Sequence, residues 1–192
     1  MSPAYLFSVL NRVIPKNSVI AEEYPSAKGD LDTHLLLDGP CSFYSVRSGI
    51  LGFGLPAAVG LQLARPDRCV VALIGDGSAQ YSIQALRSAA QYKASVVFII
   101  LCNGDYSALK AFQTFTSVGP NVPSVDIPGI DMVKLAAGYD LQSEEVDRPE
   151  DLEPALARAF ASNTPCLLSV KVRKGGERCM GINLSVNPPN YG

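Results

Sequence analysis

The sequence predicts an α/β fold of three layers, α/β/α, in which a central, mostly parallel β-sheet lies between two layers of helices. Short apolar runs such as 69–75 and 95–103 lack the polar alternation of a half-exposed strand, which indicates strands buried on both faces. Segments with helical spacing separate these runs along the chain. Strands that are joined through helices are typical of a parallel sheet with right-handed crossovers.

The predicted helices are supported by apolar spacing and, in places, by signals at their ends. Ser2 suits the N-cap of the first helix, with Pro3 at its first helical position. Gly29 weakens the second helix, and small residues fill the third. The last helix begins at Pro149 and has acidic residues in its first turn, where they interact favourably with the helix dipole. The helices are expected at 2–14, 26–37, 52–64, 82–92, 131–139 and 148–162.

The predicted strands occupy the segments between these helices. The two central ones, 69–75 and 95–103, are continuous apolar runs rich in β-branched residues. The strands are expected at 18–23, 41–46, 69–75, 95–103, 141–146 and 165–172. We therefore expect one domain over residues 1–172. The Gly- and Pro-containing stretch 173–192 has no clear period and is expected to be an irregular C-terminal tail.

The composition excludes several classes of protein. Hydrophobic residues make up 47% of the 192 residues and charged residues 18%, so an ordered core is expected. The net charge of −2, without a basic block, argues against nucleic-acid binding. No apolar run is long enough to span a membrane, and the N-terminal residues do not resemble a secretory signal. We expect a cytoplasmic protein that binds neither a membrane nor nucleic acid.

The cysteines and the histidine offer no obvious chemistry. The five cysteines are scattered without a C-x-x-C pair, which argues against a zinc site or a redox dithiol and suggests reduced thiols. His34 is the only histidine and falls in a predicted helix, so we interpret it as a structural or surface residue.

Two buried strands end in small, oxygen-bearing residues. Residues 75–78 (GDGS) follow one strand and residues 103–105 (NGD) follow the next. Ligands of open α/β sheets bind at the carboxyl ends of strands, so Asp76 and Asn103 should lie at one edge. Carboxylate and amide oxygens suit Mg²⁺ or Ca²⁺, whose remaining positions are often filled by phosphate oxygens and water. This pattern predicts a site for a metal-bound phosphate or diphosphate.

The residues beside these ligands also suit a phosphate. Gly75 and Gly77 allow the main chain to turn tightly and to approach a ligand. Ser78 is expected to begin a helix, whose free N–H groups favour an anion. Each motif taken alone could be an ordinary turn. The pair is more specific, because both motifs follow buried strands and enclose one predicted helix.

The combination of GDGS, a helix, and a strand ending in CNG resembles the signature of thiamine diphosphate-dependent enzymes. That signature is GDG followed, after some 25 to 30 residues, by commonly two asparagines. Here 26 residues separate Asp76 from Asn103, and Cys102 replaces the first asparagine. The segments 49–68, 70–86, 106–112 and 122–139 are similar to the diphosphate-binding domain of benzoylformate decarboxylases.

The resemblance implies roles for individual residues. Asp76, Asn103 and the main-chain carbonyl of Asp105 would be the metal ligands. The apolar side chain of Leu51 would support thiamine, and the carbonyl of Gly49 would accept from its 4′-amino group. Positions around the diphosphate are implied for Ser26, Gly77, Ser78 and Tyr106, a position close to that loop for Glu23, and a position in the substrate pocket for Phe112. Taken without the resemblance, Leu51, Glu23, Tyr106 and Phe112 are more readily explained as core or surface residues.

This chain departs from the family pattern at three positions. Cys102 replaces an asparagine, Pro25 stands where a hydroxyl residue is expected, and Arg47 stands where a small residue is expected. Arg47 could pair with an acidic substrate group or with the diphosphate, although an arginine more often faces solvent.

The family also needs an activating glutamate, which belongs to a separate pyrimidine-binding domain that these residues do not match. No catalytic residue is therefore expected in this chain, which would hold the cofactor but be inactive alone. It is expected to be a fragment of a longer polypeptide or one subunit of an enzyme. The pyrimidine-binding domain would be a partner, and we also expect a homo-oligomer with Leu55, Ala58, Val59 and Gln62 as a contact face.

Three functions remain open on the sequence. The first is a thiamine diphosphate-dependent decarboxylase of a small-molecule 2-oxo acid, similar to benzoylformate decarboxylase. The second is an acetolactate synthase-like carboligase. Leu51 argues mildly against this reading, because those enzymes tend to have methionine at this position. The third is a subunit that consists of the diphosphate-binding domain alone, or a non-catalytic cofactor-binding module.

Overall fold

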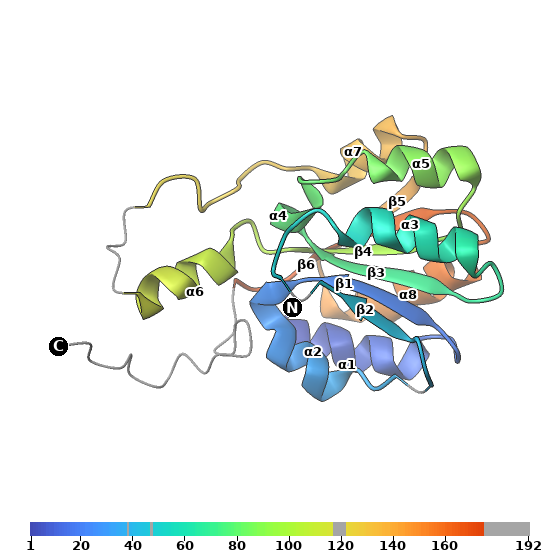
Figure 1. The fold of residues 1–192 in the computed structure, drawn as a ribbon, viewed down its shortest axis with the longest axis horizontal. Coiled ribbons are helices and arrows are strands. Elements are labelled where there is room, and N and C mark those ends of the chain that lie inside the picture. The colour runs from blue at the N-terminus through green and yellow to red at the C-terminus, as the bar shows by residue number, and fades with distance from the viewer. Residues whose placement is uncertain (38, 47, 117–121, 175–192) are drawn as a thin grey trace.

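Six parallel strands form one sheet in the described part of the chain (Figure 1). A computed structural model describes residues 1–37, 39–46, 48–116 and 122–174. The order of the strands is β2-β1-β3-β4-β6-β5, and every neighbouring pair is parallel. The strands are β1 (Val19–Glu23), β2 (Phe43–Ser45), β3 (Val70–Gly75), β4 (Val97–Cys102), β5 (Gln142–Val146) and β6 (Cys166–Lys171). All six lie within predicted strands, so the predicted parallel sheet is confirmed.

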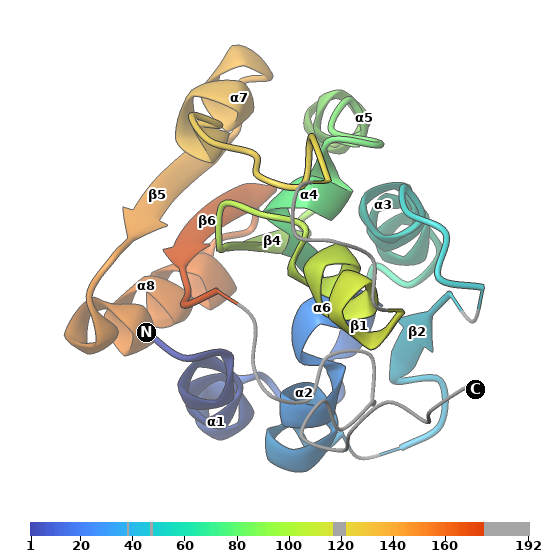
Figure 2. The same cartoon turned by 90° about the vertical axis from the view of Figure 1, so that its left-hand side faces the viewer.

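Helices cover both faces of this sheet. In Figure 2, which looks along the strands, α3, α5 and α7 lie on one face and α1, α2 and α8 on the other. The helices are α1 (Pro3–Val13), α2 (Lys28–His34), α3 (Gly54–Ala64), α4 (Asp76–Ala79), α5 (Ala85–Tyr92), α6 (Ser107–Phe115), α7 (Met132–Gly138) and α8 (Pro149–Ala161). A 3₁₀ turn, η1 (Pro25–Ala27), precedes α2. The three-layer α/β/α prediction is therefore confirmed.

The core consists of two apolar clusters, one on each side of the sheet. Leu6, Phe7 and Leu10 of α1 lie in one cluster and are fully buried. Leu55 of α3 and Phe98 of β4 lie in the other and are also fully buried. The continuous apolar strands are explained by this arrangement, because alternate side chains of one strand enter opposite clusters.

Two predicted helices differ from the observed ones in detail. The second is shorter, since a 3₁₀ turn takes its first residues and the helix ends at His34, which is half-buried. The fourth, predicted at 82–92, begins at Ala85, because residues 80–84 form turns after the single helical turn α4. Ser2 caps α1 as predicted, its side chain accepting from the N–H of Tyr5 at 3.2 Å.

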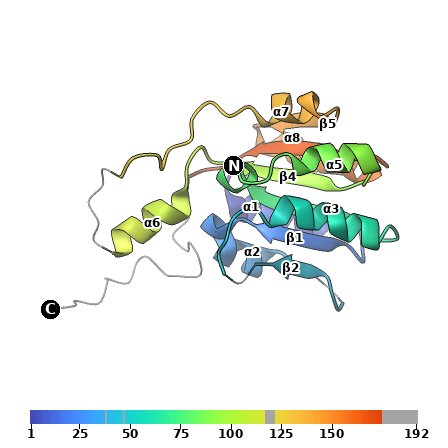
Figure 3. The same cartoon turned by 45° about the horizontal axis from the view of Figure 1, so that its top comes forward.

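Helix α6 was not predicted as an element. It extends beyond the carboxyl ends of the strands, away from the sheet (Figures 1 and 3). Leu109 and Phe112 on this helix are each 52% exposed. A helix that packs on a sheet shows a continuous apolar stripe facing the core. Since α6 does not pack on the sheet in this way, its spacing gave no clear signal.

The contact face proposed for α3 is wrong. Leu55, Ala58, Val59 and Gln62 are all buried within the domain, and the first two have no exposed surface. Gln62 donates through Nε2 to the carbonyl of Arg68 at 3.1 Å, and its Oε1 accepts from the N–H of Val70. This helix therefore uses the predicted face to pack on its own sheet.

Two further expectations concern a membrane span and the C-terminal tail. Within the described residues, no helix is both long and apolar enough to cross a membrane. The predicted C-terminal tail lies outside the described residues from residue 175 onward, and Arg47 is also outside them.

Candidate functional site

The two motifs that follow β3 and β4 lie next to each other. The strands are adjacent and parallel, with Gly75 paired to Leu101, so the residues after both strands emerge at the same edge of the sheet. Asp76 and Asn103 are each 6% exposed and line the same pocket of about 200 Å³. The predicted juxtaposition of a carboxylate and an amide at a sheet edge is therefore observed.

Asp76 is a buried carboxylate that faces main-chain donors. Its Oδ1 accepts from the N–H of Gly77 at 2.9 Å, and its Oδ2 from the N–H of Gly104 at 2.8 Å. Burial raises the pKa of Asp76 above the ordinary carboxyl value, although these two hydrogen bonds oppose the shift. The nearby Lys110 and Lys174 pair with other acids. A cation bound here would stabilise the charged form.

Asn103 and Asp105 add two further oxygens on the same loop. The Oδ1 of Asn103 accepts from the N–H of Asp105 at 3.1 Å, while its Nδ2 donates to Oγ of Ser107 at 3.0 Å. The carboxylate of Asp105 is bonded to Lys110, whose Nζ lies 3.0 Å from Oδ2. Within the described part of the chain, the main-chain carbonyl of Asp105 accepts no backbone hydrogen bond. That carbonyl therefore remains available to a ligand.

The donor set suits a hard cation that takes part of its coordination from a ligand. One carboxylate, one amide oxygen and one main-chain carbonyl are too few to complete an octahedron. Among the residues described, no group of three or more His, Cys, Asp and Glu could hold a metal, so a soft or closed metal site is not supported there. The oxygens that are present fit Mg²⁺ or Ca²⁺ bound together with a phosphate.

The main chain around Asp76 is packed too closely to allow side chains. A Cβ atom added to Gly77 would lie 2.5 Å from Cε1 of Tyr106. One added to Gly75 would lie 3.1 Å from Cδ2 of Tyr24. The two glycines therefore let aromatic rings pack directly on the loop. Tyr106 also lies within reach of a hydrogen bond, with its hydroxyl 3.5 Å from the carbonyl of Gly77.

The position of Ser78 corrects one step of the sequence argument. We expected Ser78 to begin a helix, whereas α4 begins at Asp76 and is only one turn long. Ser78 is the third residue of that turn, and it lines the pocket. A single turn lacks the dipole of a long helix, so any attraction for an anion rests on individual N–H and hydroxyl groups.

Glu23 anchors a second loop at the edge of the pocket. Its Oε1 accepts from the N–H of Gly52 at 2.7 Å, and its Oε2 accepts from the N–H of Gly54, the first residue of α3. The side chain is buried and lines an adjoining pocket of about 240 Å³. The loop that it holds carries Gly49 and Leu51, which line both pockets. Glu23 thus acts on the first pocket through the loop.

The structure brings most of the predicted site residues together. The ones that line the first pocket are Ser26, Gly49, Leu51, Gly75, Asp76, Gly77, Ser78, Asn103, Asp105 and Tyr106. Glu23 and Phe112 do not line it. Phe112 lies on α6 with half of its surface exposed, one turn beyond the pocket residues Ala108 and Leu109.

Sequence reasoning missed five residues of the same pocket, which are Tyr24, Pro25, Tyr81, Ala108 and Leu109. Leu109 lies three residues after Tyr106, and Tyr81 three residues after Ser78. The first spacing would have placed Leu109 on the pocket side if a helix had been expected at α6, whereas Tyr81 lies in the turns after α4. Pro25 was seen only as a departure from the family pattern, yet it lines the pocket.

Cys102 does not reach the pocket. Its Sγ lies 3.4 Å from Oγ of Ser169 on β6, and burial raises its pKa to about 11. The residue that stands in place of an asparagine is therefore a neutral thiol, packed between two strands.

Comparisons with known proteins agree with this geometry. The sequence model described as "Thiamine pyrophosphate enzyme, C-terminal TPP binding domain" matches residues 30–170. A benzoylformate decarboxylase of Pseudomonas aeruginosa is 42% identical over 170 residues, which cover 88% of this chain and 32% of that protein. An acetolactate synthase large subunit of Haemophilus influenzae is 38% identical over 114 residues, which cover 59% of this chain and 20% of that protein.

A solved structure also matches this chain in sequence and fold. The thiamine diphosphate-dependent 4-hydroxybenzoylformate decarboxylase of Rhodococcus jostii RHA1 is 45% identical and superposes with a TM-score of 0.86. The match covers 91% of this chain and 33% of that one. The chain therefore spans about a third of the length of these two decarboxylases.

Proposed function

This chain belongs to the thiamine pyrophosphate enzymes as a C-terminal TPP-binding domain, and from that membership we propose that it forms the diphosphate- and Mg²⁺-binding part of a 2-oxo acid decarboxylase. The observation that carries the proposal is the pocket at the carboxyl edge of β3 and β4. There, a buried carboxylate without a paired cation among the described residues lies beside an amide oxygen and an available carbonyl.

Each group of the pocket has a proposed task. Asp76, the amide oxygen of Asn103 and the carbonyl of Asp105 hold Mg²⁺, which links them to the diphosphate. The diphosphate is bound by Ser26, Ser78, Tyr106 and the main chain at Gly75 and Gly77. Leu51 and the carbonyl of Gly49 meet the ring system, on a loop that Glu23 fixes.

Thiamine diphosphate, when bound, supplies the electron sink that a 2-oxo acid needs in order to lose CO₂. This chain contributes by binding and orienting the cofactor. No catalytic acid or base is assigned to its residues. The activating glutamate would come from a pyrimidine-binding domain, in the same polypeptide or in a partner subunit. We propose that the 192-residue chain alone has no decarboxylase activity.

The substrate pocket would include the exposed apolar face of α6. Leu109 and Phe112 are three residues apart on this helix, and both expose about half of their surface. Leu109 lines the first pocket and Phe112 lies one turn beyond it, so together they offer an apolar wall to an aromatic or aliphatic 2-oxo acid. The benzoylformate decarboxylase match is 42% identical over 88% of this chain, whereas acetolactate synthase matches that cover 83% and 85% of the chain are only 29% and 31% identical, and this difference favours decarboxylation over carboligation.

The proposed homo-oligomer needs a face other than the buried one on α3. Leu63, Tyr81 and Tyr92 are each at least half exposed, and they border a groove between α3 and α5. Light scattering on the purified chain would test association.

The proposed activity is tested with the longest polypeptide that contains this chain, supplied with Mg²⁺ and thiamine diphosphate. Release of CO₂ is measured with aromatic and aliphatic 2-oxo acids, and carboligation products are measured in parallel. The proposal predicts that benzoylformate or a ring-substituted analogue is decarboxylated fastest. Acetolactate formed from pyruvate as the main product would instead identify a carboligase.

A further inference from the structure

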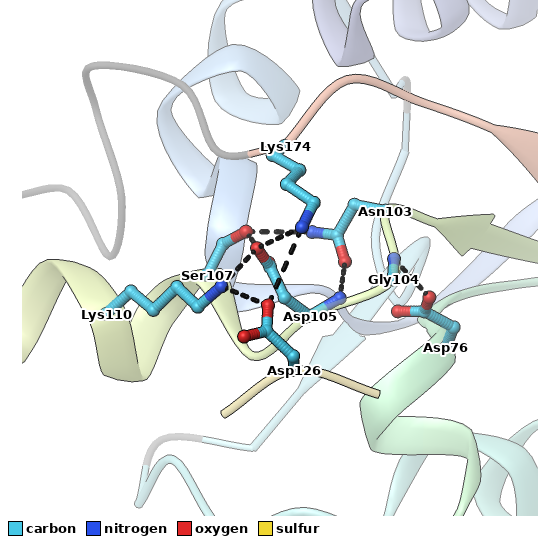
Figure 4. Close-up of polar contacts among 8 residues, drawn as sticks. All are labelled: Asp76, Asn103, Gly104, Asp105, Ser107, Lys110, Asp126 and Lys174. Carbon is cyan, nitrogen blue, oxygen red and sulfur yellow. Dashed lines mark hydrogen bonds and ion pairs between the residues drawn. The ribbon is translucent and has the colours of Figure 1, made fainter. Parts of the chain in front are cut away.

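A chain of polar contacts runs from the proposed metal loop to α6 and to the segment after β6 (Figure 4). It starts at Asn103 and includes Asp105, Ser107, Lys110 and Lys174. None of these contacts is needed to form the sheet. They connect instead residues of the proposed metal site with charged side chains outside it.

The carboxylate of Asp105 is the centre of this chain. Its side chain is only 2% exposed, and Oδ2 lies 3.0 Å from Nζ of Lys110 and 3.5 Å from Nζ of Lys174. Its Oδ1 accepts a hydrogen bond from the hydroxyl of Ser107. An ionised carboxylate can only accept, and a serine hydroxyl has a single proton to donate. The proton of Ser107 is therefore directed to Asp105.

Towards Asn103, the hydroxyl oxygen of Ser107 can therefore only accept a hydrogen bond. The amide atom that faces it must be a donor, and Nδ2 of Asn103 lies 3.0 Å from its Oγ. On the other side, Oδ1 of Asn103 faces the N–H of Asp105 at 3.1 Å. The reversed amide would place an oxygen against lone pairs and an NH₂ group against an N–H. Both contacts therefore hold the amide in one orientation.

Resting on the proposed function, we propose that the Asp105 carboxylate is a positioning residue for the metal site, acting through Ser107 on the amide of Asn103. Lys110 and Lys174 pair with this buried carboxylate and hold it in place, since an unpaired buried charge is costly. The carbonyl of Asp105 serves as one ligand, while its side chain ensures that Asn103 presents oxygen, and not nitrogen, to the cation. A cation bound by an amide requires this orientation, because an NH₂ group offers no lone pair for coordination.

The test compares Asp105→Asn and Ser107→Ala with Asp126→Asn in the 192-residue chain. Asp126 is the matched control, because it is an exposed acid that pairs with the same two lysines, Lys110 and Lys174. Binding of Mg²⁺ is measured by calorimetry in the presence of thiamine diphosphate. Both test variants should bind Mg²⁺ about 10- to 100-fold more weakly, as is usual when a partner of a metal ligand is removed. The control should change by less than about threefold, the range of an exposed ion pair.

A second readout follows the amide itself without any metal or cofactor. The ¹H–¹⁵N resonances of the Asn103 side chain report its hydrogen bond to Ser107. They should shift in Asp105→Asn and in Ser107→Ala, and keep their wild-type positions in Asp126→Asn. Unchanged resonances in both test variants would overturn the proposal. An equal loss of Mg²⁺ affinity in Asp126→Asn would also overturn it, since general electrostatics would then explain the effect.

Asp76→Ala separates this proposal from the proposed function. If Asp76→Ala abolishes Mg²⁺ binding while both test variants bind as the wild type does, the positioning role alone is overturned. If Asp76→Ala binds Mg²⁺ normally, the metal site is not where we place it, and both proposals are overturned.

Discussion

Replacing Glu23 by glutamine should weaken the fold and the cofactor site together. Both oxygens of Glu23 accept main-chain N–H groups, those of Gly52 and Gly54, in a buried position. Glutamine keeps one acceptor but turns an NH₂ group against the other N–H. Since hydrogen bonds to charged groups contribute about 1.5–3 kcal/mol and an unsatisfied buried donor costs about 1–3, we expect a loss of about 1.5–3 kcal/mol in the free energy of unfolding.

The assay is chemical denaturation of the purified chain, with Glu153→Gln as the control. Glu153 lies on α8 and forms an exposed ion pair with Arg12, so its loss should cost at most about 1 kcal/mol. Glu23→Gln should also weaken the binding of thiamine diphosphate, because the loop with Gly49 and Leu51 loses its anchor. A loss below about 0.5 kcal/mol for Glu23→Gln would refute the anchoring role.

The remaining predictions concern the packing, the thiols and the pH dependence of the site. Gly77→Ala should lower cofactor affinity, because the added Cβ would lie 2.5 Å from Tyr106, and wild-type affinity in calorimetry would contradict this. Burial raises the pKa of Cys166 to about 11, so this thiol should react with a thiol reagent only after unfolding, while the exposed Cys41 reacts at once. Equal rates would show that the strand opens readily. Burial raises the pKa of Asp76, so protons should displace Mg²⁺ at a higher pH than they would from an exposed aspartate. Mg²⁺ affinity measured against pH should therefore fall as the pH is lowered through that raised pKa.

The sequence was sufficient to predict the sheet and the ligand-bearing strand ends. Continuous apolar runs are a strong signal, and Asp76 and Asn103 each follow one of them directly. The resemblance to a family then supplied residues that no periodicity could identify. Gly49 and Leu51, for example, lie in a loop whose place beside the pocket depends on Glu23.

What the sequence did not predict depends on contacts between distant segments. Helix α6 does not pack on the sheet, so its apolar residues Leu109 and Phe112 form no stripe facing the core. The burial of Gln62 follows from hydrogen bonds to the turn before β3, which helical spacing alone cannot show. In the network around Asp105, the ion pair with Lys174 likewise joins residues far apart in the chain, which a one-dimensional pattern does not show.

The most direct test of the metal–diphosphate site is calorimetry of thiamine diphosphate binding with and without Mg²⁺. The experiment compares the wild-type chain, Asp76→Ala and, as a surface control, Asp67→Ala; Asp67 pairs with Arg65 away from the pocket. The account predicts Mg²⁺-dependent binding of the cofactor in the wild type and the control, and no such binding in Asp76→Ala. Asn103→Ala, measured in the same way, should lose only part of this binding. Wild-type affinity in Asp76→Ala would contradict the central claim that this carboxylate holds the cation.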